Sequence, residues 1–273
     1  GNIGRPLLDC ADDADWWVIE LSSYQLAYLQ AKPSIAAVLN LSDEPLDWHG
    51  GPENYRADKL RLATLAAGAP LVANHCDPEL RSRLAGLTKL VWFGNERGFH
   101  VRDGQLWHGP EKLKGPGCPQ LPGTHNLLNL AAALTIVAAA GLDPHAVWQS
   151  AESFQGLPHR LQVLGRRDGI AYVDDSLATT PVATLAALRA MAPGPVVLLV
   201  GGFDRGLDWH RFAAAIVAEP PFAVIGMPDS GSSILQTLRV AGVNPAGGLH
   251  AAAGPALAAV GGMHDVAVVP AGP

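Results

Sequence analysis

The sequence predicts an α/β fold in two domains, because short apolar runs alternate along the chain with longer Ala- and Leu-rich segments of helical spacing. That alternation is the usual order of strands and helices in a largely parallel sheet. The candidate strands are residues 16–19, 35–40, 71–74, 161–164, 196–200, 223–225 and 266–269. The candidate helices are residues 55–66, 125–140, 181–191 and 210–217.

Two segments interrupt this alternation. Residues 89–114 hold short β-prone pieces (91–93, 100–102 and 105–108) separated by Gly and Asn, which predicts a small antiparallel patch. A Gly-Leu-Pro turn at 156–158 separates a helical stretch from a strand-like one, so we place a domain boundary there. The expected domains are residues 1–156 and 157–273. An Ala-rich stretch near 251–260 is expected to be an ordinary packed helix.

Composition excludes several classes of protein. A chain of 273 residues with 48% hydrophobic content can bury a large core, and a net charge of −6 offers no broad basic surface for nucleic acid. No apolar run reaches the ~20 residues that cross a bilayer. Three scattered cysteines, Cys10, Cys76 and Cys118, fit a reducing compartment. We expect a cytoplasmic monomer that binds neither nucleic acid nor membrane, and, since no Met begins the chain, a fragment.

The first polar motif follows the apolar run at 16–19 and contains Glu20, Ser22 and Gln25. Ligands of open α/β sheets bind at the carboxyl ends of strands, and a carboxylate placed there can hold a divalent cation. The alternative is that these polar residues cap the next helix.

A second polar loop, at 39–50, is rich in acidic residues and ends near His49. Taken alone it is typical of a solvated acidic turn. The helix that follows carries Lys59, and a lysine in such a place ordinarily extends into water.

A third motif begins a helix at Gly123 and Thr124 and places Asn126 and Asn129 in its first turns. Free N–H groups at a helix start, together with two amide side chains, suit an anion or a nucleotide base. The alternative is a cap made by Thr124, with both Asn side chains in solvent.

Three further motifs follow the predicted boundary. Arg160 could form a fork to a phosphate, although Arg is also common in contacts between domains. Asp175 stands in a polar loop before a helix that Pro181 would begin. Gly201 and Gly202 follow the strand at 196–200, as is usual where a backbone approaches a ligand. Together the six motifs predict a ligand-binding cleft between two α/β domains.

In order and spacing these motifs resemble those of the Mur ligases over essentially the whole chain. The similarity is strongest to the MurD group, which adds glutamate to UDP-N-acetylmuramoyl-L-alanine. The resemblance implies a central ATPase-type domain with a mostly parallel sheet and a C-terminal Rossmann-like α/β domain. It also implies a reaction in which ATP phosphorylates the alanine carboxylate to an acyl phosphate, magnesium ions offset the charge, and the glutamate amine attacks.

The resemblance assigns a role to each motif. Glu20 and Lys59 are implied as catalytic and magnesium-binding residues, the lysine after carbamylation by carbon dioxide. The residues implied to bind ATP are Asn126, Asn129, Arg160 and Asp175. Those implied to bind the UDP-sugar are Asn2, Ser22 and Gln25, and those implied to bind glutamate are Thr179 and Arg205.

The sequence also departs from the family pattern. The Gly-rich phosphate loop that ends in Lys and Ser or Thr does not occur in this chain, so the polypeptide alone is expected to be inactive. Pro45 stands where the family has a metal-binding His, so that His49 or a water substitutes, or the site is weakened. Leu177 and Arg205 replace lysines of D-glutamate-adding enzymes, and the stretches around them resemble the subgroup that adds L-glutamate.

Other functions fit the sequence less well. A nicotinamide-dependent oxidoreductase needs a Gly-x-Gly-x-x-Gly turn with an acidic residue about 20 positions on. A Ser-His-Asp hydrolase of the common α/β type needs a Gly-x-Ser-x-Gly elbow. Neither motif is present. A non-catalytic, Mur-like nucleotide-binding relic is the remaining alternative, supported by Pro45 and by the missing phosphate loop.

Overall fold

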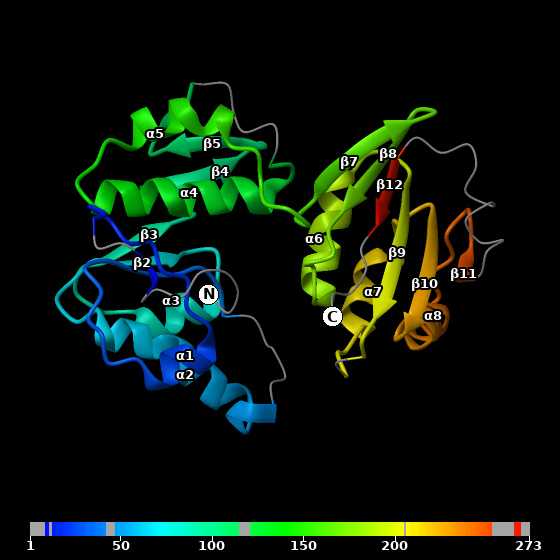
Figure 1. Cartoon of the computed structure of the whole chain (residues 1–273), viewed down its shortest axis with the longest axis horizontal. Coiled ribbons are helices and arrows are strands. Elements are labelled where there is room, and N and C mark those ends of the chain that lie inside the picture. Colours follow the sequence, from blue (N-terminus) through cyan, green and yellow to red (C-terminus); the bar gives the residue numbers. More distant parts are fainter. Residues whose placement is uncertain are drawn as a thin grey trace. The chain divides into compact units, whose positions relative to one another are not determined.

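The structure is a computed structural model, and it describes residues 9–10, 13–41, 47–114, 121–204, 206–252 and 265–268. The chain divides into two compact units (Figure 1). Unit 1 comprises Gly1–Leu113 and Leu128–Val147, and unit 2 comprises Lys114–Leu127 and Trp148–Pro273. Both units combine helices with parallel strands, which confirms the predicted α/β fold. The domain boundary between residues 156 and 157 stays a prediction.

Unit 1 is built on a parallel sheet with the strand order β1 (Ala36–Val38), β2 (Leu71–Asn74) and β3 (Leu90–Phe93). All four residues of β2 are buried, as expected for a strand that lies between two others. The strand predicted at 71–74 is therefore confirmed, and the strand predicted at 35–40 forms over its central residues.

Helices flank both faces of this sheet (Figure 1). On one face, α2 (Pro52–Leu65) and α3 (Pro78–Leu84) pack Leu60 and Leu80 against Ala73 of β2. On the opposite side lies α4 (Thr124–Ala139). Shorter helical elements are α1 (Ser23–Tyr28), η2 (Asp47–His49), α5 (Pro144–Ser150) and η3 (Ala151–Ser153). The predicted helices at 55–66 and 125–140 are confirmed with small shifts of their ends.

A separate antiparallel sheet consists of β4 (Phe99–Arg102), β5 (Gln105–His108) and β6 (Glu111–Lys112). This confirms the patch predicted within 89–114, except for its first piece. Residues 91–93 belong to β3 and pair in parallel with β2, so their assignment to the patch was wrong. The reason is physical: β-prone side chains suit either kind of ladder, and only the neighbouring strand decides which one forms.

The strand predicted at 16–19 does not form. These residues have no strand pairing, and their side chains are exposed, that of Val18 to 97%. A strand exists only through hydrogen bonds to a neighbour, and no strand in the described part of the chain pairs with this segment. The apolar pattern of a segment indicates that it could form a strand, but it does not reveal whether a neighbouring strand is available for pairing.

Unit 2 contains a six-stranded sheet in which all neighbouring strands are parallel except the antiparallel pair β7 and β8 at one edge. The order of its strands is β11 (Leu249–Ala251), β10 (Ala223–Asp229), β9 (Val196–Gly202), β12 (Asp265–Val268), β8 (Ile170–Asp174) and β7 (Gln162–Arg167). The strands predicted at 196–200 and 223–225 lie in this sheet, as do residues 266–268 of the strand predicted at 266–269, whose last residue lies outside the described residues. Residues 162–164 begin β7.

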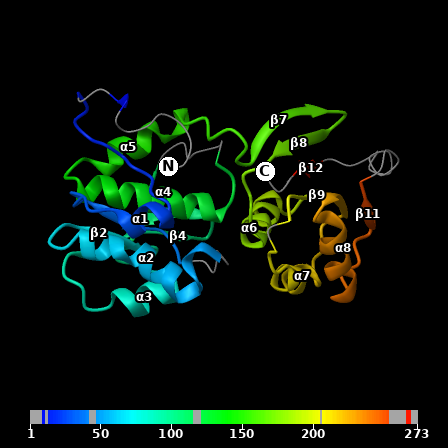
Figure 2. The same ribbon diagram turned by 60° about the horizontal axis from the view of Figure 1, so that its bottom comes forward.

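The helices α6 (Pro181–Met191), α7 (His210–Ile216) and α8 (Gly231–Val240) lie along one face of this sheet (Figure 2). Leu198 of β9 shares a core there with Phe212 and Leu235, whereas its neighbour Leu199 packs in a second cluster. This is the alternation of side chains expected along a strand. The predicted bounds of α6 are confirmed, because Thr180 caps its N-terminus and Pro181 fits its first turn.

Two further expectations concern the segment near residues 251–260 and the absence of a membrane span. Of the helix predicted near 251–260, residues 253–260 lie outside the described residues, and Ala251 ends strand β11. Within the described ranges, no helix has the length and apolar character needed to cross a membrane.

Candidate active site

The first predicted motif leads into helix α1. The Ser22 hydroxyl accepts a hydrogen bond from the backbone N–H of Gln25 at 3.3 Å, and the Gln25 amide oxygen accepts one from the backbone N–H of Ser22 at 2.9 Å. This capping box satisfies two N–H groups that a helix start would leave free. The structural alternative for Ser22 and Gln25 is thus formed, while their contact with a UDP-sugar stays a prediction. Glu20, just before the cap, is exposed.

Lys59 does not extend freely into water. Its side chain is half-buried on helix α2, and its ammonium nitrogen lies 4.9 Å from the centre of the Tyr55 ring. Such a cation–π contact is worth about 0.5–1 kcal/mol. No carboxylate of the described chain forms an ion pair with Lys59, and the buried Tyr55 hydroxyl has no hydrogen-bond partner there either. The ammonium is therefore held over an aromatic ring, and no described carboxylate provides it with a counter-charge.

A buried hydrogen-bond network connects this helix with the first motif. The imidazole of His49 has a side-chain exposure of 0%; its Nδ1 lies 2.7 Å from Oδ2 of Asp58, and its Nε2 lies 3.0 Å from Oγ of Ser23. Because a carboxylate only accepts, Nδ1–H donates to Asp58, and in the neutral imidazole Nε2 then accepts from the Ser23 hydroxyl. Sequence reasoning did not connect these three residues, since nothing in the spacing of distant positions reveals a shared contact.

The network bears on whether His49 can act as a metal ligand in place of the His that Pro45 replaces. Both ring nitrogens of His49 are engaged and buried, so His49 has no free nitrogen to replace the family's metal-binding His. Pro45 itself lies outside the described residues. No three His, Cys, Asp or Glu side chains gather into a metal site within the described ranges. Glu20 and a carbamylated Lys59 would supply two ligand groups, so the described residues alone do not complete a magnesium site.

The helix with the predicted Asn pair begins at Thr124. The Asn126 amide donates to the carbonyl of Pro122 at 2.8 Å and so closes the turn before the helix, while Asn129 is exposed one turn further on. Gly123 has a φ of +94°, and a Cβ there would come within 2.7 Å of Cβ of Ala190. Close packing against Ala190 and the positive φ therefore explain the glycine at this position without a ligand. The binding of ATP by the two Asn residues stays a prediction.

Arg160 and Asp175 both lie in unit 2, close enough for the Arg160 charge to act on the Asp175 carboxyl, while their binding of ATP stays a prediction. Asp175 is buried, and its Oδ1 accepts the N–H of Leu161 at 3.1 Å. Burial raises the pKa of Asp175, while the Leu161 hydrogen bond and the positive charge of Arg160 offset part of that rise. Burial and the same Arg160 charge lower the pKa of His125. Arg160 is exposed and forms no ion pair with a described residue, so its guanidinium is available to a ligand.

The backbone around Arg160 is unusual. His159 and Leu161, on either side of it, have φ of +61° and +46°, a left-handed conformation that non-glycine residues rarely adopt. Three contacts hold His159: its Nδ1 lies 2.6 Å from Oδ2 of Asp174, its N–H donates to the Gln162 amide oxygen at 3.0 Å, and its carbonyl accepts the N–H of Leu177 at 3.2 Å. Burial works to raise the pKa of Asp174, but hydrogen bonds from His159 and Ser176 hold that pKa below its ordinary value. The surrounding contacts thus fix the direction in which Arg160 leaves the chain.

The remaining predicted residues are placed only in part. Thr179 is half-buried just before helix α6, and its hydroxyl makes no hydrogen bond within the described chain. Asn2 and Arg205 lie outside the described residues. Gly201 has a φ of +150°, and a Cβ there would come within 2.7 Å of the backbone oxygen of Met227. Close approach to the neighbouring strand β10 therefore explains this glycine without a ligand.

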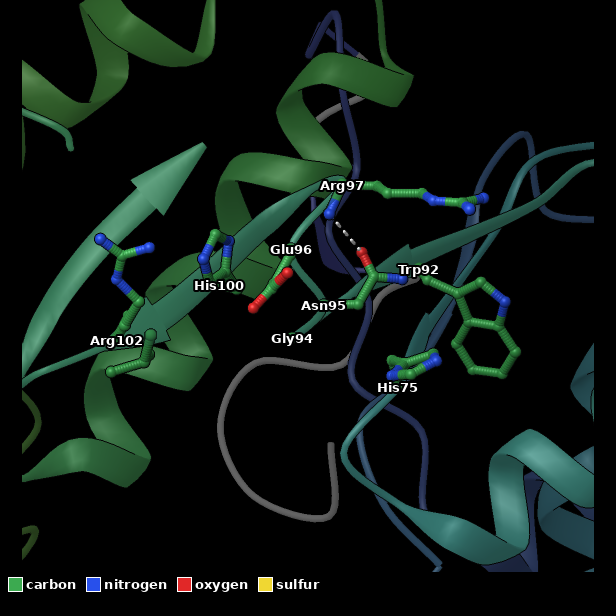
Figure 3. A pocket seen from close by; sticks show the side chains of 9 residues that line it. His75, Trp92, Gly94, Asn95, Glu96, Arg97, His100 and Arg102 are labelled. Carbon is green, nitrogen blue, oxygen red and sulfur yellow. Dashed lines mark hydrogen bonds between the residues drawn. The ribbon is translucent and has the colours of Figure 1, made fainter. Parts of the chain in front are cut away.

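A pocket that no sequence motif indicated lies in unit 1, at the carboxyl ends of β2 and β3 (Figure 3). Its volume is about 750 Å³, and its lining includes His75, Trp92, Asn95, Arg97 and His100. The rings of His75 and Trp92 meet edge to face at 5.6 Å, and the Asn95 amide oxygen accepts the N–H of Arg97. In Figure 3 the Arg97 side chain extends away from that turn. The volume suits a small molecule, and strand ends of this kind are where parallel sheets bind ligands.

Comparison with known proteins identifies close relatives. Residues 3–137 match the Mur ligase middle domain. The UDP-N-acetylmuramoyl-L-alanine–L-glutamate ligase of Xanthomonas oryzae pv. oryzae is 43% identical over 258 residues, which is 92% of this chain and 55% of that protein. The ligase of the same name from Micromonospora sp. is 43% identical over 87% of this chain and 54% of that protein. The chain thus spans about half the length of the curated relatives it matches.

Solved structures share the fold at low sequence identity. The MurF ligase of Thermotoga maritima in complex with ADP superposes with a TM-score of 0.67 at 19% identity, covering 89% of this chain and 59% of that chain. MurF from Acinetobacter baumannii gives a TM-score of 0.70 at 17% identity, covering 92% and 58%. Folylpolyglutamate synthase of Mycobacterium tuberculosis gives 0.61 at 17% identity, covering 88% and 61%. These likenesses confirm the α/β architecture.

Proposed function

Because this chain belongs to the Mur ligase family, we propose that the complete protein is an ATP-dependent ligase that joins L-glutamate to UDP-N-acetylmuramoyl-L-alanine. The observation that carries the proposal is the 43% identity, over 92% of this chain, to a ligase of that name. Leu177, in place of a lysine of D-glutamate-adding enzymes, favours the L-enantiomer. The reaction would serve peptidoglycan precursor synthesis in the cytoplasm.

The proposed chemistry has two steps. The γ-phosphoryl group of ATP passes to the alanine carboxylate, which becomes an acyl phosphate while ADP leaves. The amine of glutamate then attacks the acyl carbon, inorganic phosphate departs, and the nitrogen loses a proton to give the amide. Little covalent work is left to the protein, so its contribution is to position the reactants and to offset negative charge.

For the nucleotide, we propose that Arg160 binds a phosphate group and that Asp175 binds the ribose. The exposed Arg160 guanidinium, unpaired within the described chain, would form the charge-assisted fork to phosphate that this side chain favours. Asp175 uses Oδ1 for Leu161, which leaves Oδ2 to accept from a ribose hydroxyl. Asn126 and Asn129, at the start of α4, would contact the adenine and the phosphates.

For the reacting carboxylate, we propose that Lys59 is carbamylated. Its amine would add to carbon dioxide and lose a proton, which converts a cation into a carboxylate-like group. The absence of an ion-pair partner among the described residues supports this, because no carboxylate competes for the nitrogen. Glu20 and the carbamate are oxygen donors of the kind magnesium prefers. The remaining ligands would come from water, substrate or residues beyond those described.

The remaining substrate contacts follow the family pattern. Ser22 and Gln25 at the start of α1, together with Asn2, would bind the UDP-sugar. Thr179, whose hydroxyl has no partner within the described chain, and Arg205 would bind the carboxylates of glutamate.

The test is phosphate release from ATP by a form of the protein that spans the full length of its relatives. Turnover with UDP-N-acetylmuramoyl-L-alanine and L-glutamate, but not D-glutamate, is the expected result. Lys59→Ala should abolish turnover, and Lys59→Arg should not restore it, because a guanidinium does not form a carbamate. Absence of turnover with either enantiomer would overturn the proposal in favour of a nucleotide-binding relic, and full activity of either variant would remove Lys59 from the mechanism.

A further inference from the structure

The geometry of unit 1 points to a positioning role for three buried residues: we propose that the Ser23–His49–Asp58 network holds Lys59 in its working orientation. The inference rests on the proposed function of Lys59. It starts from the location of the three residues, since each belongs to a different segment that also carries a predicted site residue or motif. Ser23 opens helix α1 next to Ser22, His49 ends the acidic loop, and Asp58 precedes Lys59 on helix α2.

The arrangement has the order and distances of a hydrolytic Ser-His-Asp triad, but burial rules out that use. Ser23 is 6% exposed and His49 is 5% exposed as a whole residue, so a substrate carbonyl does not reach the Ser23 oxygen. The pocket at the ends of β2 and β3 contains none of the three residues. A buried network in which every ring nitrogen is engaged instead rigidifies the segments that it joins.

His49 is attached to helix α2 at three points around Lys59. Its Nδ1–H donates to Asp58 at 2.7 Å, its backbone carbonyl accepts the Asn54 amide at 2.8 Å, and its ring meets that of Tyr55 at 5.4 Å. Tyr55 lies one helical turn before Lys59 and carries the ammonium over its ring. Together these contacts fix the rotation of α2 about its own axis, and with it the direction of Lys59.

On the opposite side, the same imidazole is attached to helix α1. Its Nε2 is hydrogen-bonded to the Ser23 hydroxyl at 3.0 Å, and its ring lies 5.1 Å from that of Tyr24. The two helices that carry the predicted UDP-sugar and magnesium residues are thus joined through one side chain. Residues that orient a catalytic ligand in this indirect way typically change metal affinity or activity by about 10–100-fold when they are removed.

Steady-state kinetics of the full-length protein test the inference. Asp58→Ala should lower kcat by about 10–100-fold while KM for ATP and glutamate stays near the wild-type value. Asp58→Asn should recover most of kcat, because its amide oxygen still accepts from Nδ1–H. Ser23→Ala, which removes a single hydroxyl, should also lower kcat and serves if Asp58→Ala does not fold. His210→Ala is the matched control, since His210 forms a 2.6 Å pair with Asp208 on the surface. Wild-type kcat in folded Asp58→Ala would overturn the inference.

A second readout separates this inference from the proposed function. Lys59 of the folded protein can be acetylated with acetic anhydride and its labelling rate followed by mass spectrometry, without any ligase activity. The rate should rise in Asp58→Ala and Ser23→Ala, because the lysine leaves the Tyr55 ring, and should stay at the wild-type value in Asp58→Asn and His210→Ala. An inactive wild-type protein with this labelling pattern would sink the ligase proposal alone, whereas unchanged labelling in an active protein would sink the positioning role.

Discussion

The substitution Asp175→Asn tests whether the buried carboxyl of Asp175 lowers the free energy of unfolding of the native chain. Burial raises the pKa of Asp175, and the Leu161 hydrogen bond and Arg160 offset this only in part. A raised pKa means that the folded chain binds this proton more tightly than the unfolded chain does. The contribution of Asp175 to the free energy of unfolding is therefore fully present below the unfolded pKa of about 3.9, and it is lost as the pH rises through the folded value.

The geometry also sets the expected order of the variants. In Asp175→Asn, the amide oxygen still accepts the Leu161 N–H, which lies 3.1 Å from Oδ1 in the native chain, and no charge is buried. In Asp175→Ala that buried N–H loses its partner, which costs about 1–3 kcal/mol. At neutral pH we therefore expect Asp175→Asn to be at least as stable as wild type, and Asp175→Ala to be less stable than both.

Urea-induced unfolding at a series of pH values measures both effects. The neighbouring carboxyl provides a control of opposite sign. The pKa of Asp174 is lowered, so Asp174 contributes stability above the unfolded pKa that is lost as the pH falls through the folded value. Asp174→Asn should remove that acid-side loss. The reasoning fails if Asp175→Asn is as unstable as Asp175→Ala at neutral pH, or if it keeps the wild-type dependence on pH.

Two further predictions concern the core and the nucleotide. Leu198→Ala should lower the free energy of unfolding by about 2–5 kcal/mol, because Leu198 is 0% exposed in the core beneath α6 to α8; urea unfolding checks this, and a loss under about 1 kcal/mol would contradict the packing. Arg160→Ala should raise the Kd for ATP about 10–100-fold, from the loss of charged hydrogen bonds, while the surface control Arg239→Ala leaves it unchanged in calorimetry. Equal affinity of both variants would exclude Arg160 from the ATP site.

Local signals predicted the elements that depend on local chemistry. Helix α6 has the bounds expected from sequence because Thr180 and Pro181 define its start without help from the rest of the chain. The same holds for β2, a short apolar run between turns. The strand expected at 16–19 failed because pairing is not a local property, and residues 91–93 joined a different sheet for the same reason.

In the candidate site, too, the sequence indicated single residues but not the contacts between distant ones. Asp175 was singled out because its polar loop follows a strand and precedes a helix start, and Lys59 because the family resemblance implied a role for it; both roles stay predictions. The partners that define their environment were not singled out, since Asp58 and Ser23 are 9 and 26 residues from His49. The capping role of Ser22 is local and therefore predictable, because Ser22 and Gln25 have the three-residue spacing of a capping box.

The His49 network also leads to a prediction about the magnesium requirement of a Pro45→His variant. If His49 replaced the family's metal-binding His, adding an imidazole at position 45 would change little. Because both nitrogens of His49 are engaged by Ser23 and Asp58, we infer that His49 does not take the place of that ligand. Pro45→His in the full-length protein should therefore lower the magnesium concentration that gives half-maximal turnover, whereas His49→Ala should act mainly on kcat. A wild-type magnesium requirement in Pro45→His, together with a raised requirement in His49→Ala, would instead make His49 the ligand and refute the positioning role.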